Sequence, residues 1–103
     1  MKKEEIIREF QNLQQQLQNI IVQKETLKIQ KMDIEKALDE LEKTKEKNAY
    51  KIIGNIMIRK SIEEIKNELN ETKESLDLRI KSLEKMEKNI TQKLKDLESK
   101  IKV

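Results

Sequence analysis

The sequence has no cysteine, no histidine and no proline, and it has one glycine, Gly54, among 103 residues. Without cysteine the chain cannot form a disulfide framework or a thiolate metal site. Without histidine it lacks the commonest metal ligand and the usual general base near neutral pH, so Ser-His and Cys-His catalytic pairs are excluded. The carboxylates are scattered, and scattered carboxylates on helices are normally solvated. We therefore expect no enzymatic activity, no metal site and no cofactor.

Aromatic residues and long apolar runs are also scarce. The chain has one Phe, one Tyr and no Trp, and 35% of its residues are hydrophobic against 42% charged. A compact globule of this size would need more apolar surface to offset chain entropy, whereas helices that bury one narrow stripe fit this composition. No apolar run approaches the roughly 18 residues of a membrane span. The opening segment MKKEEIIREF has acidic residues where a signal peptide has an apolar core, so we expect a soluble, cytoplasmic protein with no membrane contact.

The charges of the two signs nearly balance, with a formal net charge of +3. Residues 1–47 carry ten basic and ten acidic side chains, and residues 48–103 carry thirteen and ten. The small excess is scattered and has no aromatic residues interleaved with it, which is poor material for a phosphate-binding patch. We therefore predict no nucleic-acid partner. The low net charge and the regular apolar spacing also argue against disorder.

Residues 1–47 carry a coiled-coil pattern. Steps of four and three from Ile6 to Leu41 reach eleven positions, of which nine are apolar, and such a stripe over five heptads is typical of a coiled coil. The two exceptions, Lys24 and Lys31, are expected to pack their stems and to direct their charged heads to water or to set the register. The stripe is Ile6, Phe10, Leu13, Leu17, Ile20, Lys24, Leu27, Lys31, Ile34, Leu38 and Leu41.

Residues 61–103 repeat this pattern. Apolar residues recur at every seventh position, at Ile62, Leu69, Leu76, Leu83, Ile90 and Leu97. A companion line is expected at Ile65, Thr72, Ile80, Met86, Leu94 and Ile101, with a shift of one position in its middle. Ser61 and Glu64 fit a capping box and mark the start of this helix. The two helices should fold back on each other as an antiparallel pair.

The segment NAYKIIGNIMIRKS, residues 48–61, does not resemble a helix. Gly54 accepts the positive φ that the first position of a type II′ turn needs, so Gly54-Asn55 predicts a hairpin in which Ile53 faces Ile56. A plain helix-to-helix turn is the alternative, but it would need fewer and more polar residues. An isolated hairpin is marginally stable and has free edges, so it predicts an oligomer. The expected interface residues are Tyr50, Ile52, Ile53, Gly54, Ile56, Met57 and Ile58.

Helix, hairpin YKIIGNIMIRK and helix, with FQNLQQQLQNIIVQK early in the first helix and LDLRIKSLEKMEKNITQKLKDLESKI in the second, together resemble β-type subunits of the prefoldin family. The likeness covers nearly the whole chain. One departure is that the second strand runs straight into Ser61, where many β-type subunits have a few extra residues. We expect a mainly α fold in a single domain, residues 1–103. The resemblance implies an antiparallel two-helix coiled coil (1–47 and 61–103) with a central β-hairpin (48–60) that joins an oligomeric β-barrel.

The resemblance implies a hexamer of two α-type and four β-type subunits, whose hairpins form a β-barrel platform that carries the coiled coils. It also implies a chaperone that holds unfolded proteins at the coiled-coil tips and passes them to a group II chaperonin without hydrolysing ATP. The two chain ends cannot keep every stripe residue covered, so apolar residues there are expected to contact clients. These are Ile6, Ile7, Phe10, Leu13, Leu94, Leu97, Ile101 and Val103, among which Leu13 and Leu97 should serve mainly as core.

Two alternatives remain open from the sequence. The segment from Phe10 to Gln23 contains no charge. It is either a solvated face of amides or a face that clients of either sign can approach without repulsion. The whole chain, in turn, could be a structural scaffold or tether that forms a small homo-oligomer and binds no client.

Overall fold

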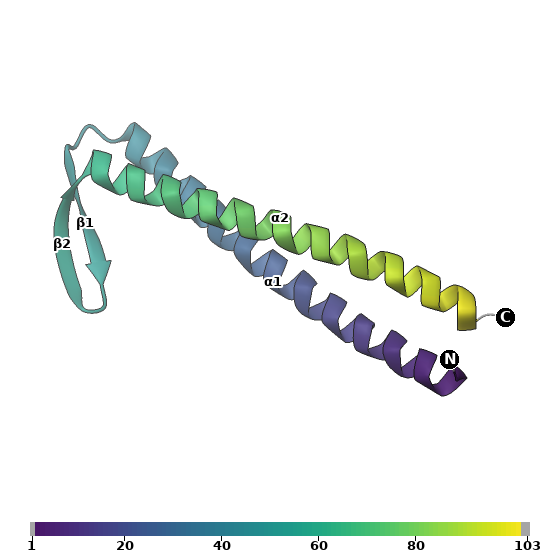
Figure 1. Ribbon diagram of the computed structural model, residues 1–103. Coiled ribbons are helices and arrows are strands. Elements are labelled where there is room, and N and C mark those ends of the chain that lie inside the picture. Colours follow the sequence, from purple (N-terminus) through teal and green to yellow (C-terminus); the bar gives the residue numbers. More distant parts are fainter. Residues whose placement is uncertain (1, 102–103) are drawn as a thin grey trace. The chain divides into compact units, whose positions relative to one another are not determined.

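The computed structural model describes residues 2–101 and contains two long helices joined through a β-hairpin (Figure 1). Helix α1 spans Lys3–Lys43, strand β1 Asn48–Ile53, strand β2 Ile56–Ser61 and helix α2 Ile62–Ile101. This confirms the predicted mainly α fold with one central hairpin. Neither helix is long and apolar enough to cross a membrane over the part of the chain that is described.

The chain divides into two compact units, and each is described by itself. One consists of Met1–Leu27 and Arg79–Val103 and is called the terminal unit below. The other consists of Lys28–Leu78 and is called the hairpin unit.

The core of the terminal unit is a single layer of aliphatic side chains between α1 and α2, which run antiparallel (Figure 1). Residues seven apart fall on one stripe of a helix, so burying one stripe from each helix brings the two together. Leu83 is the most deeply buried, with 1% of its surface exposed. The buried residues are Ile6, Leu13, Ile20, Leu83, Ile90 and Leu97, with Phe10, Leu17, Leu27, Leu94 and Ile101 packed against them.

The companion line on α2 differs from the prediction at two positions. Thr72 and Met86 are exposed, whereas the following residues, Lys73 and Glu87, are half-buried. The line therefore keeps a spacing of seven and passes through Lys73, Ile80, Glu87, Leu94 and Ile101, without the expected shift. The prediction was wrong at Thr72 because it counted from Ile65, and at Met86 because it preferred an apolar residue to the charged one beside it. In the structure Lys73 pairs with Glu35 and Glu87 pairs with Lys24, both on α1.

Lys24 shows how a charged residue is accommodated in the stripe. Its Nζ lies 2.5 Å from Oε2 of Glu87 on the facing helix. This hydrogen bond raises the pKa of Lys24 above its ordinary value, against the opposing effect of partial desolvation. A charge in this layer would be unfavourable beside an apolar residue, so the pair favours the register that the helices adopt.

Ion pairs also join the helices within the hairpin unit. Lys31 Nζ lies 2.6 Å from Asp77 Oδ1, and Lys66 Nζ lies 3.0 Å from Glu42 Oε1. The apolar stripe continues between them, but Leu38 is only half-buried. Partly exposed ion pairs contribute little free energy individually. Their effect here is to specify which turns of α1 and α2 face each other.

The helix ends next to the hairpin have identifiable signals. The Thr44 amide donates to the Glu40 carbonyl at 3.1 Å in the last turn of α1, and the Thr44 hydroxyl accepts from the Glu46 amide at 3.2 Å. The helix thus ends at Lys43, earlier than the boundary expected at residue 47, because the Thr44 side chain stabilises a turn. At the other end, the Glu64 amide donates to the Ser61 hydroxyl at 3.1 Å, which is the predicted N-cap.

We predict that Leu83→Ala lowers the free energy of unfolding by about 2–5 kcal/mol, because it leaves a cavity in the single apolar layer. Leu78→Ala is the matched control on the same helix, since Leu78 is 70% exposed, and it should change stability by less than about 0.5 kcal/mol. Denaturant unfolding followed by circular dichroism measures both. Equal losses in the two variants would contradict the assigned core.

Candidate functional site

The hairpin forms with the register expected from the sequence. β1 and β2 pair antiparallel, with Ile53 opposite Ile56 and Ile52 opposite Met57. Gly54 has a φ of 60°, and no positive φ occurs at Asn55. A positive φ at the first loop position alone is the pattern of a type II′ turn, which matches the twist of the strands. The segment is thus a true hairpin and not a plain turn between helices.

Both faces of the hairpin carry apolar side chains in contact with solvent. Because side chains alternate along a strand, Tyr50, Ile52 and Met57 share one face, and Ile53, Ile56 and Ile58 share the other. All six are 40–70% exposed. Every side-chain-bearing residue predicted for the interface is therefore left uncovered by the chain itself, as is the loop at Gly54.

The hairpin is attached to α2 through the carboxylate of Glu68. Lys51 Nζ on β1 lies 3.0 Å from Glu68 Oε2, and Lys60 Nζ on β2 lies 2.5 Å from Glu68 Oε1. The hydrogen bonds from Lys60 and Lys51 lower the pKa of Glu68, and the same carboxylate raises the pKa of Lys60. The ion pairs of Glu68 therefore stabilise the folded state at neutral pH, and this stabilisation is lost as the pH falls through the lowered pKa of Glu68.

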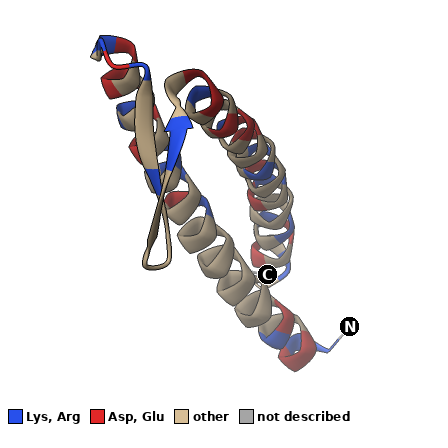
Figure 2. Cartoon of the chain, turned by 90° about the vertical axis from the view of Figure 1, so that its left-hand side faces the viewer, with Lys and Arg blue, Asp and Glu red and all other residues tan. Residues whose placement is uncertain are grey.

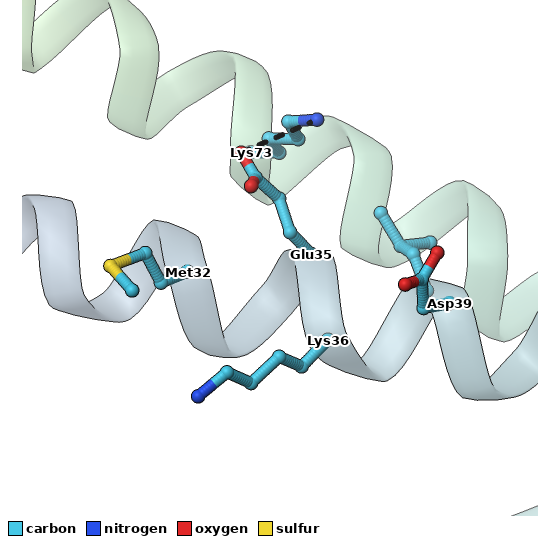
Figure 3. A pocket seen from close by; sticks show the side chains of 6 residues that line it. Met32, Glu35, Lys36, Asp39 and Lys73 are labelled. Atoms are coloured by element: carbon cyan, nitrogen blue, oxygen red, sulfur yellow. Dashed lines mark ion pairs between the residues drawn. The ribbon is translucent and has the colours of Figure 1, made fainter.

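The hairpin unit has several hollows, lined by side chains of α1, α2 and the hairpin. A groove of about 290 Å³ lies between β1 and α2, lined by Tyr50, Lys51, Ile65, Glu68, Leu69 and Thr72. A larger, open hollow of about 540 Å³ is lined by Met32, Glu35, Lys36, Leu38, Asp39 and Lys73. Lys73 Nζ lies 3.7 Å from Glu35 Oε1, the ion pair marked by the dashed line in Figure 3, and Lys36 extends away from α2. Two charged groups of the larger hollow are thus already paired with each other.

The terminal unit brings together six of the eight residues expected to contact clients. Ile6, Leu13 and Leu97 are buried in its core, as the sequence suggested for the last two. Phe10, Leu94 and Ile101 are half-buried against that core. Of the remaining two, Ile7 is 38% exposed, and Val103 lies outside the described residues. The apolar surface that faces solvent in the terminal unit is therefore smaller than the eight predicted residues would provide.

Further exposed apolar residues were not singled out from the sequence. They are Val22, Ile29, Met32, Leu78 and Met86. Val22 and Ile29 are seven residues apart and lie outside the buried stripe. That spacing is the signal that could have identified them, because a heptad position that is apolar without belonging to the core faces solvent.

The uncharged segment of α1 presents amides to solvent. All eight of its Gln and Asn side chains are exposed: Gln11, Asn12, Gln14, Gln15, Gln16, Gln18, Asn19 and Gln23. Figure 2 shows this stretch of α1 without blue or red, whereas both colours recur along α2. Amides supply hydrogen-bond donors and acceptors but no net charge. The surface is therefore polar and electrostatically neutral.

Known proteins are similar to this chain over most of its length. A family model described as "Prefoldin subunit" matches residues 4–103. The prefoldin subunit beta of Archaeoglobus fulgidus is 34% identical over 97 residues, covering 93% of this chain and 84% of that one. The prefoldin subunit beta of Thermococcus onnurineus is 36% identical over 94 residues, covering 90% and 81%. The crystal structure of the prefoldin beta subunit from Thermococcus strain KS-1 has a TM-score of 0.89 at 31% identity, covering 96% and 88%.

We predict that Gly54→Ala destabilises the hairpin by about 1–2 kcal/mol, because an L side chain is strained at this positive φ. An added Cβ would meet nothing within 4 Å, so the effect isolates backbone strain. Amide hydrogen exchange in β1 and β2 should accelerate roughly 5- to 30-fold. Asn55→Ala is the control and should change exchange little, since its φ is not positive. Equal exchange in both variants would rule out the strain at Gly54.

Proposed function

Because the chain belongs to the prefoldin family as a β-type subunit, we propose that it works as an ATP-independent chaperone in a hexamer of two α-type and four β-type subunits. Prefoldin subunits are chaperones and not enzymes, and they assemble with one another. In the proposed mechanism the complex is cytoplasmic, holds non-native proteins at the coiled-coil tips, prevents their aggregation and passes them to a group II chaperonin. The observation that carries the proposal is the hairpin with six exposed apolar side chains.

Assembly through the hairpin follows from the groups it leaves unsatisfied. The ribbon is apolar on both faces and has two strand edges, so a partner on one side would leave the other side in water. Neighbouring hairpins that pair along their edges and curve into a barrel satisfy the edges and cover one face of each ribbon. The proposed interface is Tyr50, Ile52, Ile53, Gly54, Ile56, Met57 and Ile58.

Client binding is proposed for the apolar residues of the terminal unit. Ile7 and the accessible parts of Phe10, Leu94 and Ile101 offer the first contacts, since these side chains reach solvent. Buried Ile6, Leu13 and Leu97 support them from below and add apolar surface when the helix ends separate. Val103 is a further proposed client contact. Several of these residues are flexible aliphatics, which suit many unrelated partners.

Co-expression with an α-type prefoldin subunit tests the proposed function. We expect a complex with the mass of a hexamer that suppresses aggregation of an unfolded substrate without ATP. A monomer or small homo-oligomer without suppression would contradict the proposal and favour a structural tether.

The hairpin variant Ile56→Asp belongs in the same experiment. It should dissolve the complex while circular dichroism still reports most of the helix content, because the charge enters the apolar interface and not the coiled coil. Ile29→Asp on α1 is its matched control, since Ile29 and Ile56 are both 59% exposed. A complex that survives Ile56→Asp, or falls apart equally with Ile29→Asp, would exclude the hairpin as the interface.

The amide surface yields a prediction about which clients are held. Gln15→Glu with Gln18→Glu should weaken holding of acidic clients by up to about fivefold, since one like-charge contact in water costs roughly 1 kcal/mol. Holding of basic clients should be unchanged or stronger. Asn67→Glu with Asn70→Glu is the control, because it adds the same charge at two exposed amides with the same spacing. Light scattering measures aggregation, and undiminished suppression with acidic clients would refute a neutral docking face.

A further inference from the structure

The orientation of the hairpin depends on few contacts with its own chain. Among the described residues, no hairpin side chain belongs to the buried core. The backbone closes the base of the hairpin, where the Ile62 amide donates to the Lys47 carbonyl at 2.9 Å. Beyond that base, the two strands reach α2 through the ion pairs of Lys51 and Lys60 with Glu68. The side chains that will face a partner are therefore positioned by a small, polar contact.

The geometry of this contact restrains rotation as well as distance. Lys51 and Lys60 belong to cross-strand pairs that are two positions apart, Lys51–Ile58 and Ala49–Lys60, and therefore lie diagonally on the same face of the ribbon. Each lysine takes a different oxygen of Glu68, Oε2 for Lys51 and Oε1 for Lys60. A single ion pair would leave the ribbon free to rotate, whereas ion pairs from both strands hold the face that carries Lys51 and Lys60 toward α2. Lowering of the Glu68 pKa by both lysines agrees with simultaneous engagement.

We propose that Glu68 latches the hairpin onto α2, so that neighbouring prefoldin subunits meet its strand edges and apolar faces in one preset orientation. Glu68 is then a positioning residue for assembly and lies outside the apolar interface itself. The inference rests on the proposed assembly through the hairpin. Its energetic consequence is a lower ordering cost when subunits join, because the ribbon is already oriented before docking.

The free full-length chain allows the latch to be measured apart from assembly. The sequence has no cysteine, so spin labels attached through Asn55→Cys and Ser75→Cys report the distance between the hairpin loop and α2. Both positions are exposed and lie in the hairpin unit. We expect a narrow distance distribution in the labelled parent and a broad one with Glu68→Gln. A distribution that remains narrow with Glu68→Gln would overturn the latch.

Assembly with an α-type subunit is then followed for the same changes without labels. Glu68→Gln should assemble about two- to tenfold more slowly or more weakly, the range expected from losing two partly exposed ion pairs. Glu71→Gln is the matched control, because it removes one charge from an exposed position on the same helix. The triple reversal Lys51→Glu, Lys60→Glu and Glu68→Lys should restore both the narrow distribution and assembly, whereas Glu68→Lys alone should not.

Ionic strength provides a second test. Salt reduces the Debye length from about 10 Å at 0.1 M to about 3 Å at 1 M, which weakens exposed ion pairs but not apolar burial. NaCl should therefore broaden the distance distribution and slow assembly in the parent, with a smaller effect on Glu68→Gln. Equal salt dependence in both would count against the latch. If Ile56→Asp loses assembly but keeps a narrow distance distribution, the interface and the latch are separate features. If Glu68→Gln has a broad distance distribution but assembles normally, assembly does not need a preset orientation and the latch proposal is wrong.

Discussion

Burial of one aliphatic stripe from each helix is the interaction on which the rest of this structure depends. With 42% of its residues charged, the chain has apolar side chains for a single layer between two helices and for the hairpin, and for little else. Ile20, Leu83 and Ile90 show the result, since each is buried while the residues beside it in sequence are partly or fully exposed. Because the helices bury their apolar stripes against each other, these stripes are not available to cover the hairpin. The hairpin is thus exposed because the helices bury their apolar stripes within the coiled coil.

Charged residues within the stripe add specificity to this layer. Aliphatic side chains would pack in several registers of comparable energy, but Lys24 finds Glu87 in only one of them. Lys31 is in a similar position beside Asp77, whose hydrogen bond raises the pKa of the lysine. Such pairs contribute modest stability, and their value lies in penalising registers that would leave a charge facing an apolar residue. The apolar layer holds the helices together, and the ion pairs decide their alignment.

The proposed assembly and the proposed client binding use the same hydrophobic effect with different geometry. In the hairpin, strand edges demand hydrogen-bonded partners in a definite register, so an interface built there would be specific and lasting. The terminal unit has no strand edges among its described residues, and aliphatics such as Ile7 accept many shapes. Contacts of that kind are non-directional, which suits transient holding of unrelated chains. The latch at Glu68 belongs to the first kind, because orientation matters only where pairing is directional.

The sequence by itself determined the helical faces and the hairpin register. All eleven stripe positions of α1 are buried or half-buried, since spacing alone decides which side of a helix a residue occupies. The two-residue loop at Gly54 likewise sets which residues of β1 and β2 are opposite. Only the tertiary structure decided that Lys24 pairs with Glu87, because the two residues are 63 positions apart in the sequence. The engagement of Glu68 by both strands was likewise decided there, since periodicity is a local property whereas a pair of charges forms only when folding brings distant residues within a few ångströms.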